Sequence, residues 1–201
     1  MLGCWWFGGI VEDLLTNDPL VQIDHDLALW FHRHGTPTLT FVARILTFFG
    51  SVAFITSASI GAALVFLWRK SRDALLAVVC TMGGGSLLNI FLKHIFHRQR
   101  PVLENPLVTL SSYGFPSGHT MGATLFYGLM ALFATGLCAS WQSRVLAWSG
   151  LGTLILLVGL SRIYLGAHYL SDVMGAMAAA IVWLAVCWTA GETVRGKPRP
   201  R

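Results

Sequence analysis

The stretch Asp172–Ala190, DVMGAMAAAIVWLAVCWTA, decides the fold class of this chain. After its first residue it contains no Asp, Glu, Lys or Arg. An α-helix needs about 20 mainly apolar residues to cross the hydrocarbon core of a membrane. We therefore predict a membrane-spanning helix here, and we expect its small residues, Gly175, Ala176 and Ala178–Ala180, to allow close packing against other helices.

Four more stretches of the same kind precede it: Val52–Trp68, Ala74–Phe96, Thr120–Ser140 and Val145–Tyr164. The second contains Gly83–Gly85, which costs about 1 kcal/mol per Gly in a helix and therefore indicates close helix packing rather than a hinge. Met1–Val11 is apolar but short, because Glu12 and Asp13 follow it. We expect an all-α, polytopic membrane bundle of five transmembrane helices plus this N-terminal stub, which is either part of a first span or a half-inserted segment.

The composition agrees with a membrane protein. Of the 201 residues, 55% are hydrophobic and 11% are charged, whereas soluble domains carry about 25% charged residues. This excludes an ordinary soluble domain and a disordered chain. The net charge of +5 fits nucleic acid, anionic lipid or an anionic substrate, so the positions of the charges must decide. The four cysteines lack the spacing of a zinc or redox site, and we interpret them as small core residues.

Before the spans lies Leu20–Gly35, in which Leu20, Ile23, Leu27 and Phe31 recur at helical spacing opposite Asp24, His25, Asp26 and His32. This pattern is typical of an amphipathic helix that lies in the membrane interface. We interpret His25, His32 and His34 as interface residues. The expected organisation is a stub and interfacial helix over 1–35, a transmembrane core over 36–190 and a basic tail over 191–201.

The Lys and Arg residues of the short loops set the expected orientation, because cytoplasmic loops are rich in them. Eight lie on one predicted side of the membrane: Arg69, Lys70, Arg72, Arg144, Arg195, Lys197, Arg199 and Arg201. We predict that this side, with the C-terminus, is cytoplasmic. The polar clusters described next then face away from the cytoplasm.

Three clusters of polar residues stand at that opposite face, where ionisable side chains are costly and indicate function. Lys93 and Arg100 are two helical turns apart, before Pro101. Pro116-Ser117-Gly118-His119 opens a span, and the N–H groups at a helix start form an anion site. In the third cluster, Ser161-Arg162 precedes His168, which stands four residues before Asp172. On a helix, that carboxylate can accept from one imidazole nitrogen and leave the other free.

Each of these features taken singly is common in structural roles. Together, three cationic side chains, two histidines, a carboxylate and a helix N-terminus predict a phosphate site, because cations neutralise phosphate oxygens while backbone N–H groups bind them.

The pattern Lys93-x6-Arg100-Pro101, Pro116-Ser117-Gly118-His119 and Ser161-Arg162-x5-His168-x3-Asp172 resembles the signature of the type 2 phosphatidic acid phosphatase family, which vanadium haloperoxidases and bacterial acid phosphatases share. Membrane members typically have six spans, whereas five and a stub are evident here.

The resemblance implies metal-independent hydrolysis of a lipid phosphate, without a cofactor, through a phosphohistidine on His168. It further implies that Asp172 orients His168 and that His119 serves as general acid and then base. The phosphate would be bound by Lys93, Arg100, Arg162, the hydroxyl and N–H of Ser117 and the N–H of Gly118. We interpret His94, His97 and Arg98, which lie outside the matched positions, as interface residues, with contact to the substrate headgroup as the alternative.

Several alternatives remain at this point. The substrate is undecaprenyl diphosphate, phosphatidylglycerol phosphate or phosphatidic acid, and a phosphotransferase of the same family would pass the phosphoryl group to another acceptor. A haloperoxidase is disfavoured by the membrane spans. An anion transporter is disfavoured because the polar residues gather at one face and no repeat is evident. Nucleic-acid binding is disfavoured because the basic residues are divided between two membrane faces. The sequence leaves the oligomeric state open.

Overall fold

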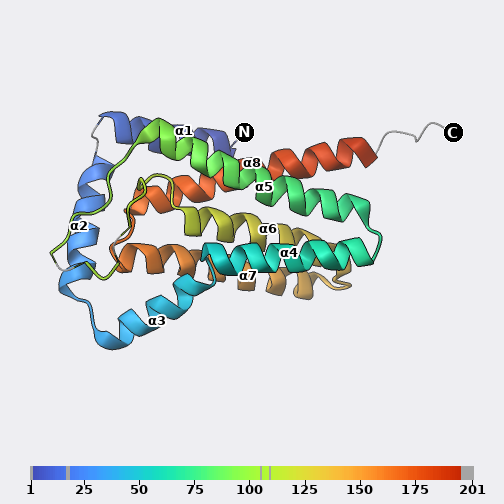
Figure 1. Ribbon diagram of the computed structural model, residues 1–201, viewed down its shortest axis with the longest axis horizontal. Coiled ribbons are helices and arrows are strands. Elements are labelled where there is room, and N and C mark those ends of the chain that lie inside the picture. Colours follow the sequence, from blue (N-terminus) through green and yellow to red (C-terminus); the bar gives the residue numbers. More distant parts are fainter. Residues whose placement is uncertain (1, 17–18, 105, 109, 196–201) are drawn as a thin grey trace.

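The computed structural model describes residues 2–16, 19–104, 106–108 and 110–195, and within these ranges all regular structure is helical (Figure 1). The all-α prediction is confirmed. The helices, in chain order, are α1 (Leu2–Thr16), α2 (Pro19–Arg33), α3 (Pro37–Phe48), α4 (Val52–Trp68), α5 (Arg72–Phe96), α6 (Gly118–Leu137), α7 (Trp141–Tyr164) and α8 (Leu170–Arg195). Residues 196–201 of the expected basic tail lie outside the described residues.

Five segments of the described chain are long and apolar enough to cross a membrane, as the sequence predicts. They are Pro37–Trp68, Arg72–Phe96, Gly118–Leu137, Trp141–Tyr164 and Leu170–Thr193. The first begins earlier than expected because it includes α3. A break separates α3 from α4, since Phe49 caps the C-terminus of α3 and the Ser51 side chain caps the N-terminus of α4.

The N-terminal stub forms one helix, α1, which continues past Glu12 and Asp13 to Thr16. Its 15 residues extend about 22 Å at 1.5 Å per residue, less than the hydrocarbon core of about 30 Å. α1 packs against α8.

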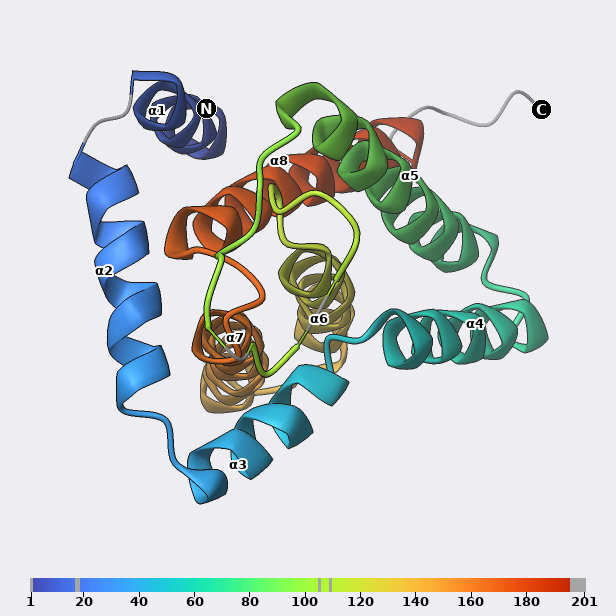
Figure 2. The ribbon, with the colours of Figure 1, turned by 60° about the vertical axis from the view of Figure 1, so that its left-hand side comes forward.

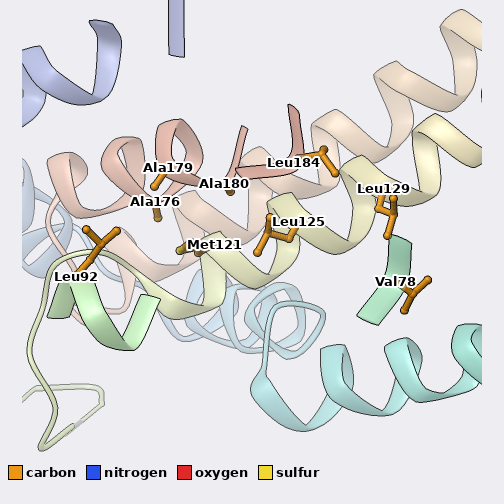
Figure 3. Close-up of a cluster of buried hydrophobic side chains, with 9 residues drawn as sticks. All are labelled: Val78, Leu92, Met121, Leu125, Leu129, Ala176, Ala179, Ala180 and Leu184. Carbon is orange, nitrogen blue, oxygen red and sulfur yellow. The ribbon is translucent and has the colours of Figure 1, made fainter. Parts of the chain in front are cut away.

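α6 lies at the centre of the bundle, between α7, α8, α5 and α4 (Figure 2). Leu125 and Leu129 of α6 are almost fully buried and pack with Val78 of α5 and Ala180 of α8 (Figure 3). A Cβ atom on Gly85 would clash with the Leu125 side chain, and one on Gly84 would clash with Trp183. Close packing is thus confirmed for these two glycines, whereas Gly83 has no such neighbour within 4 Å.

α2 crosses the ends of α7 and α8 and differs from the expected amphipathic helix (Figure 2). Ile23 and Trp30 are 50% and 52% exposed, while Asp24 is 1% exposed. The expectation that Asp24 belongs to a water-facing side is wrong, because this carboxylate points into the protein and finds hydrogen-bond donors there.

The helix directions bring the three polar clusters together. α5 and α7 end at the same end of the bundle at which α6 and α8 begin, and the described residues of the connecting segment 97–117 lie there too (Figure 1). The α4–α5 and α6–α7 connections, with the basic residues Arg69, Lys70 and Arg144, lie at the opposite end (Figure 1).

Candidate active site

Lys93 and Arg100 are held by the segment that connects α5 to α6. Lys93 Nζ donates to the Tyr113 carbonyl oxygen at 2.6 Å. Arg100 donates from Nε to the Ser112 carbonyl oxygen at 2.7 Å and from Nη1 to that of Ala167 at 2.6 Å. Because carbonyl groups on both sides of the site fix the Arg100 guanidinium, its position is set before any substrate binds.

His168 lies in the short connection between α7 and α8 and is 2% exposed. Its Nε2 is 3.1 Å from Arg100 Nη1, and its Nδ1 is 3.4 Å from Asp172 Oδ2. An N–H of Arg100 facing Nε2 requires a lone pair on Nε2, which places the imidazole proton on Nδ1, toward Asp172. The Nδ1–Oδ2 distance is longer than a well-formed hydrogen bond, as is common in catalytic pairs before substrate binds.

Burial lowers the pKa of His168 to about 4, and the positive charges of Arg100 and Arg162 act in the same direction, while Asp172 opposes them. The imidazole is therefore neutral at pH 7, and its Nε2, which faces Arg100, carries the lone pair that a nucleophile requires.

Arg162, near the end of α7, is 3% exposed. Its Nη1 donates to Thr47 Oγ1 of α3 at 2.7 Å, while its Nε has no hydrogen-bond partner within the described residues. A buried guanidinium N–H without a partner is costly. A phosphate oxygen bound here would remove that cost.

Ser117 and Gly118 begin α6, but one of the expected donors is already used. The Ser117 N–H donates to the Asp172 carbonyl oxygen at 3.1 Å, so the expectation that it binds phosphate is wrong. Its hydroxyl oxygen accepts from the Thr120 hydroxyl at 3.0 Å, which leaves the hydroxyl hydrogen available as a donor. The Gly118 N–H belongs to the first turn of α6, where N–H groups have no partner within the helix.

His119 follows in the same turn and is half-buried. The structure brings the eight predicted site residues to one end of the bundle: Lys93, Arg100, Ser117, Gly118, His119, Arg162, His168 and Asp172.

Arg98 also differs from its sequence-based interpretation. The interpretation as an interface residue is wrong, because its side chain is 16% exposed and its Nη1 lies 2.5 Å from Asp172 Oδ1. Burial alone would lower the pKa of Arg98, but Asp172 and Asp24 raise it above its ordinary value, so the side chain is charged. The sequence offered only a weak signal that Arg98 belongs to the site: it is a third cation beside Lys93 and Arg100, two residues before Arg100.

His94 and His97 behave differently from Arg98. His94 Nδ1 contacts the Ile90 carbonyl oxygen of its own helix at 2.8 Å, and the His97 ring packs edge-on against Tyr113. Both are exposed, as the interface interpretation expects.

Comparison with known proteins finds relatives that are named as lipid phosphatases. The sequence is 36% identical over 149 residues to phosphatidylglycerophosphatase B of Bacillus subtilis (strain 168), covering 73% of this chain and 72% of that protein. It is 29% identical over 146 residues to undecaprenyl-diphosphatase BcrC of the same organism, covering 69% of each chain.

A solved structure with a similar fold belongs to the same kind of enzyme as these relatives. The fold is similar to the crystal structure of a transmembrane PAP2 type phosphatidylglycerolphosphate phosphatase from Bacillus subtilis, with a TM-score of 0.85, 28% identity and 98% coverage of both chains. Residues 74–195, which include every motif position from Lys93 to Asp172, match the PAP2 superfamily. This chain therefore belongs to the PAP2 superfamily.

Proposed function

We propose that this membrane lipid phosphatase uses His168 as its nucleophile on a terminal phosphate or diphosphate. The observation that carries the proposal is the orientation of His168. Its Nε2 faces the cationic site at 3.1 Å from Arg100, while its Nδ1 faces Asp172.

In the first step, the Nε2 lone pair attacks phosphorus and the bond from phosphorus to the leaving oxygen breaks. His119 donates a proton to that oxygen, a contribution of about 10²–10⁴-fold for a well-placed acid. Asp172 compensates the positive charge that develops on the His168 ring. Lys93, Arg100 and Arg162 stabilise the negative charge on the equatorial oxygens.

In the second step, His119 removes a proton from water, and the resulting oxygen attacks the phosphohistidine. The N–P bond breaks, its electron pair returns to Nε2, and phosphate leaves. Because three side-chain cations neutralise the phosphoryl oxygens, we expect the reaction to proceed without a metal ion.

The site at the end of the spans fits an amphiphile whose phosphate lies at headgroup height. Among the candidates, the named relatives support phosphatidylglycerol phosphate and undecaprenyl diphosphate ahead of phosphatidic acid. We further propose that this end faces away from the cytoplasm, since the basic loops lie at the other end.

The test is phosphate release by the purified full chain in EDTA from these three lipids in parallel, with His168→Ala and His34→Ala compared. His34 is exposed and contacts its own helix at the Trp30 carbonyl oxygen. We expect release by the wild type and by His34→Ala, and none by His168→Ala.

Two results would contradict the proposal: unchanged release by His168→Ala, or activity that EDTA abolishes and Mg²⁺ restores. A phosphorylated acceptor formed in place of free phosphate would indicate a phosphotransferase.

A further inference from the structure

α2 contributes a buried carboxylate to the vicinity of the site, although none of the three motifs includes this helix. The Asp24 side chain is fully buried. Its Oδ1 accepts from the Ser171 N–H at 2.9 Å, and its Oδ2 accepts from Arg98 Nη2 at 2.7 Å and from the Ser171 hydroxyl. Carboxylates are rarely buried unless they are paired. Asp24 is therefore a buried and paired residue rather than a surface residue.

Arg98 connects Asp24 to the proposed orienting residue. Its Nη1 donates to Asp172 Oδ1 at 2.5 Å, while its Nη2 reaches Asp24. The guanidinium carbon lies 4.6 Å from the centroid of the Tyr169 ring, which covers it. The second oxygen of Asp172 faces His168 at 3.4 Å. A continuous chain of contacts therefore runs from α2 through Arg98 and Asp172 to His168.

The charges of Asp172, Arg98 and Asp24 give the second carboxylate, that of Asp24, a physical role. Arg98 paired with Asp172 alone is a neutral pair, and Asp172 then offers His168 little net negative charge. With Asp24 added, the three side chains carry a net charge of −1. In a buried site such charges interact strongly, because the effective dielectric constant is low.

We propose that Asp24 is a positioning residue, which neutralises Arg98 so that the charge of Asp172 remains available to His168. This inference rests on the proposed function, in which His168 becomes positively charged as it attacks phosphorus. Asp24 also binds the N–H of Ser171, in the first turn of α8, and so holds the backbone just after His168.

The test is the variant Asp24→Asn, which keeps an oxygen for the Ser171 N–H but removes the charge. Arg98 then pairs with Asp172 alone. Its positive charge offsets the negative charge that Asp172 would otherwise present to His168. We expect kcat for phosphatidylglycerol phosphate to fall about 10- to 100-fold, the loss known for removal of the hydrogen-bond partners that orient metal ligands, with KM nearly unchanged. Asp26→Asn is the matched control, since Asp26 is exposed on the same helix, and should retain the wild-type kcat.

The double variant Asp24→Asn/Arg98→Gln separates charge compensation from a merely structural contact. Without the Arg98 charge, Asp172 again faces His168 with its full charge, so we expect kcat to rise above that of Asp24→Asn. A purely structural role predicts that the second substitution lowers kcat further. That result, or an Asp24→Asn enzyme with wild-type kcat, overturns the inference.

Three further outcomes are distinguishable. If Asp24→Asn does not fold, the double variant alone decides, since the inference requires it to retain much more activity than His168→Ala. If wild-type phosphate release does not depend on His168, the proposed function fails. If that release depends on His168 but Asp24→Asn equals Asp26→Asn, the inference about Asp24 fails by itself.

Discussion

At the scale of single residues, the protonation state of His168 is the property on which the proposed chemistry depends most. Burial, Arg100 and Arg162 lower its pKa to about 4, against the opposing effect of Asp172. A nucleophilic nitrogen must carry a free lone pair, so this environment keeps the group active well below the ordinary histidine pKa of about 6.5.

Nitrogen-15 NMR of the labelled imidazoles, with His168→Gln used for assignment, measures this directly. We predict that His168 stays neutral at pH 5.5, below the ordinary histidine pKa of about 6.5. A midpoint near 6.5 for His168 would contradict the electrostatic description of the site.

The residue scale also shows what the sequence could not supply. The sequence paired Lys93 with Arg100, and His168 with Asp172, by assuming helical spacing. In the structure α5 ends at Phe96 and α8 begins at Leu170, so Arg100 and His168 lie in connecting segments that bring them to the site. The pairing of Arg98 with Asp24 spans 74 positions and depends on how α2 packs, which no local pattern encodes. The Ser117 N–H was misassigned for the same reason, since its partner, the Asp172 carbonyl oxygen, belongs to another helix.

At the scale of secondary-structure elements, the spans were predictable from hydropathy, and the predicted span Val52–Trp68 has the bounds of α4. The direction of α2 was not predictable. The central packing of α5 against α6 and α8 depends on Gly84 and Gly85, where a side chain would meet Trp183 or Leu125. Gly83 in the same helix has no neighbour within 4 Å of its added Cβ. The three adjacent glycines therefore differ in their tolerance of side chains.

We predict that Gly85→Val destabilises the protein by about 1–3 kcal/mol, as overpacking of a close contact usually does. Gly83→Ala should be neutral or slightly stabilising, because Ala favours a helix over Gly by about 1 kcal/mol. Unfolding of the detergent-solubilised proteins, followed by circular dichroism, provides the comparison. Equal stability of the two variants would show that the α5–α6 contact is looser than described.

At the scale of the whole molecule, the bundle has two chemically different ends. One contains the proposed phosphate site and α2, and the other contains the α4–α5 and α6–α7 connections with their basic residues (Figure 1). The excess of Lys and Arg at the second end predicts that it is cytoplasmic.

Reporter fusions test this orientation. A fluorescent protein fused after Arg201 should fluoresce, because it folds in the cytoplasm, and an alkaline phosphatase inserted after Val102 should be active, because it requires an oxidising compartment. The opposite pattern would place the active site in the cytoplasm.

The central claim is that the phosphoryl group passes through His168, and trapping of the intermediate tests it most directly. The enzyme is mixed with lipid labelled with ³²P in its terminal phosphate, quenched in base within the first turnover, digested and analysed by mass spectrometry. We predict a base-stable, acid-labile phosphate on the peptide that contains His168, and none in His168→Ala. Label on another residue, or phosphate release at the wild-type rate by His168→Ala, would contradict the account.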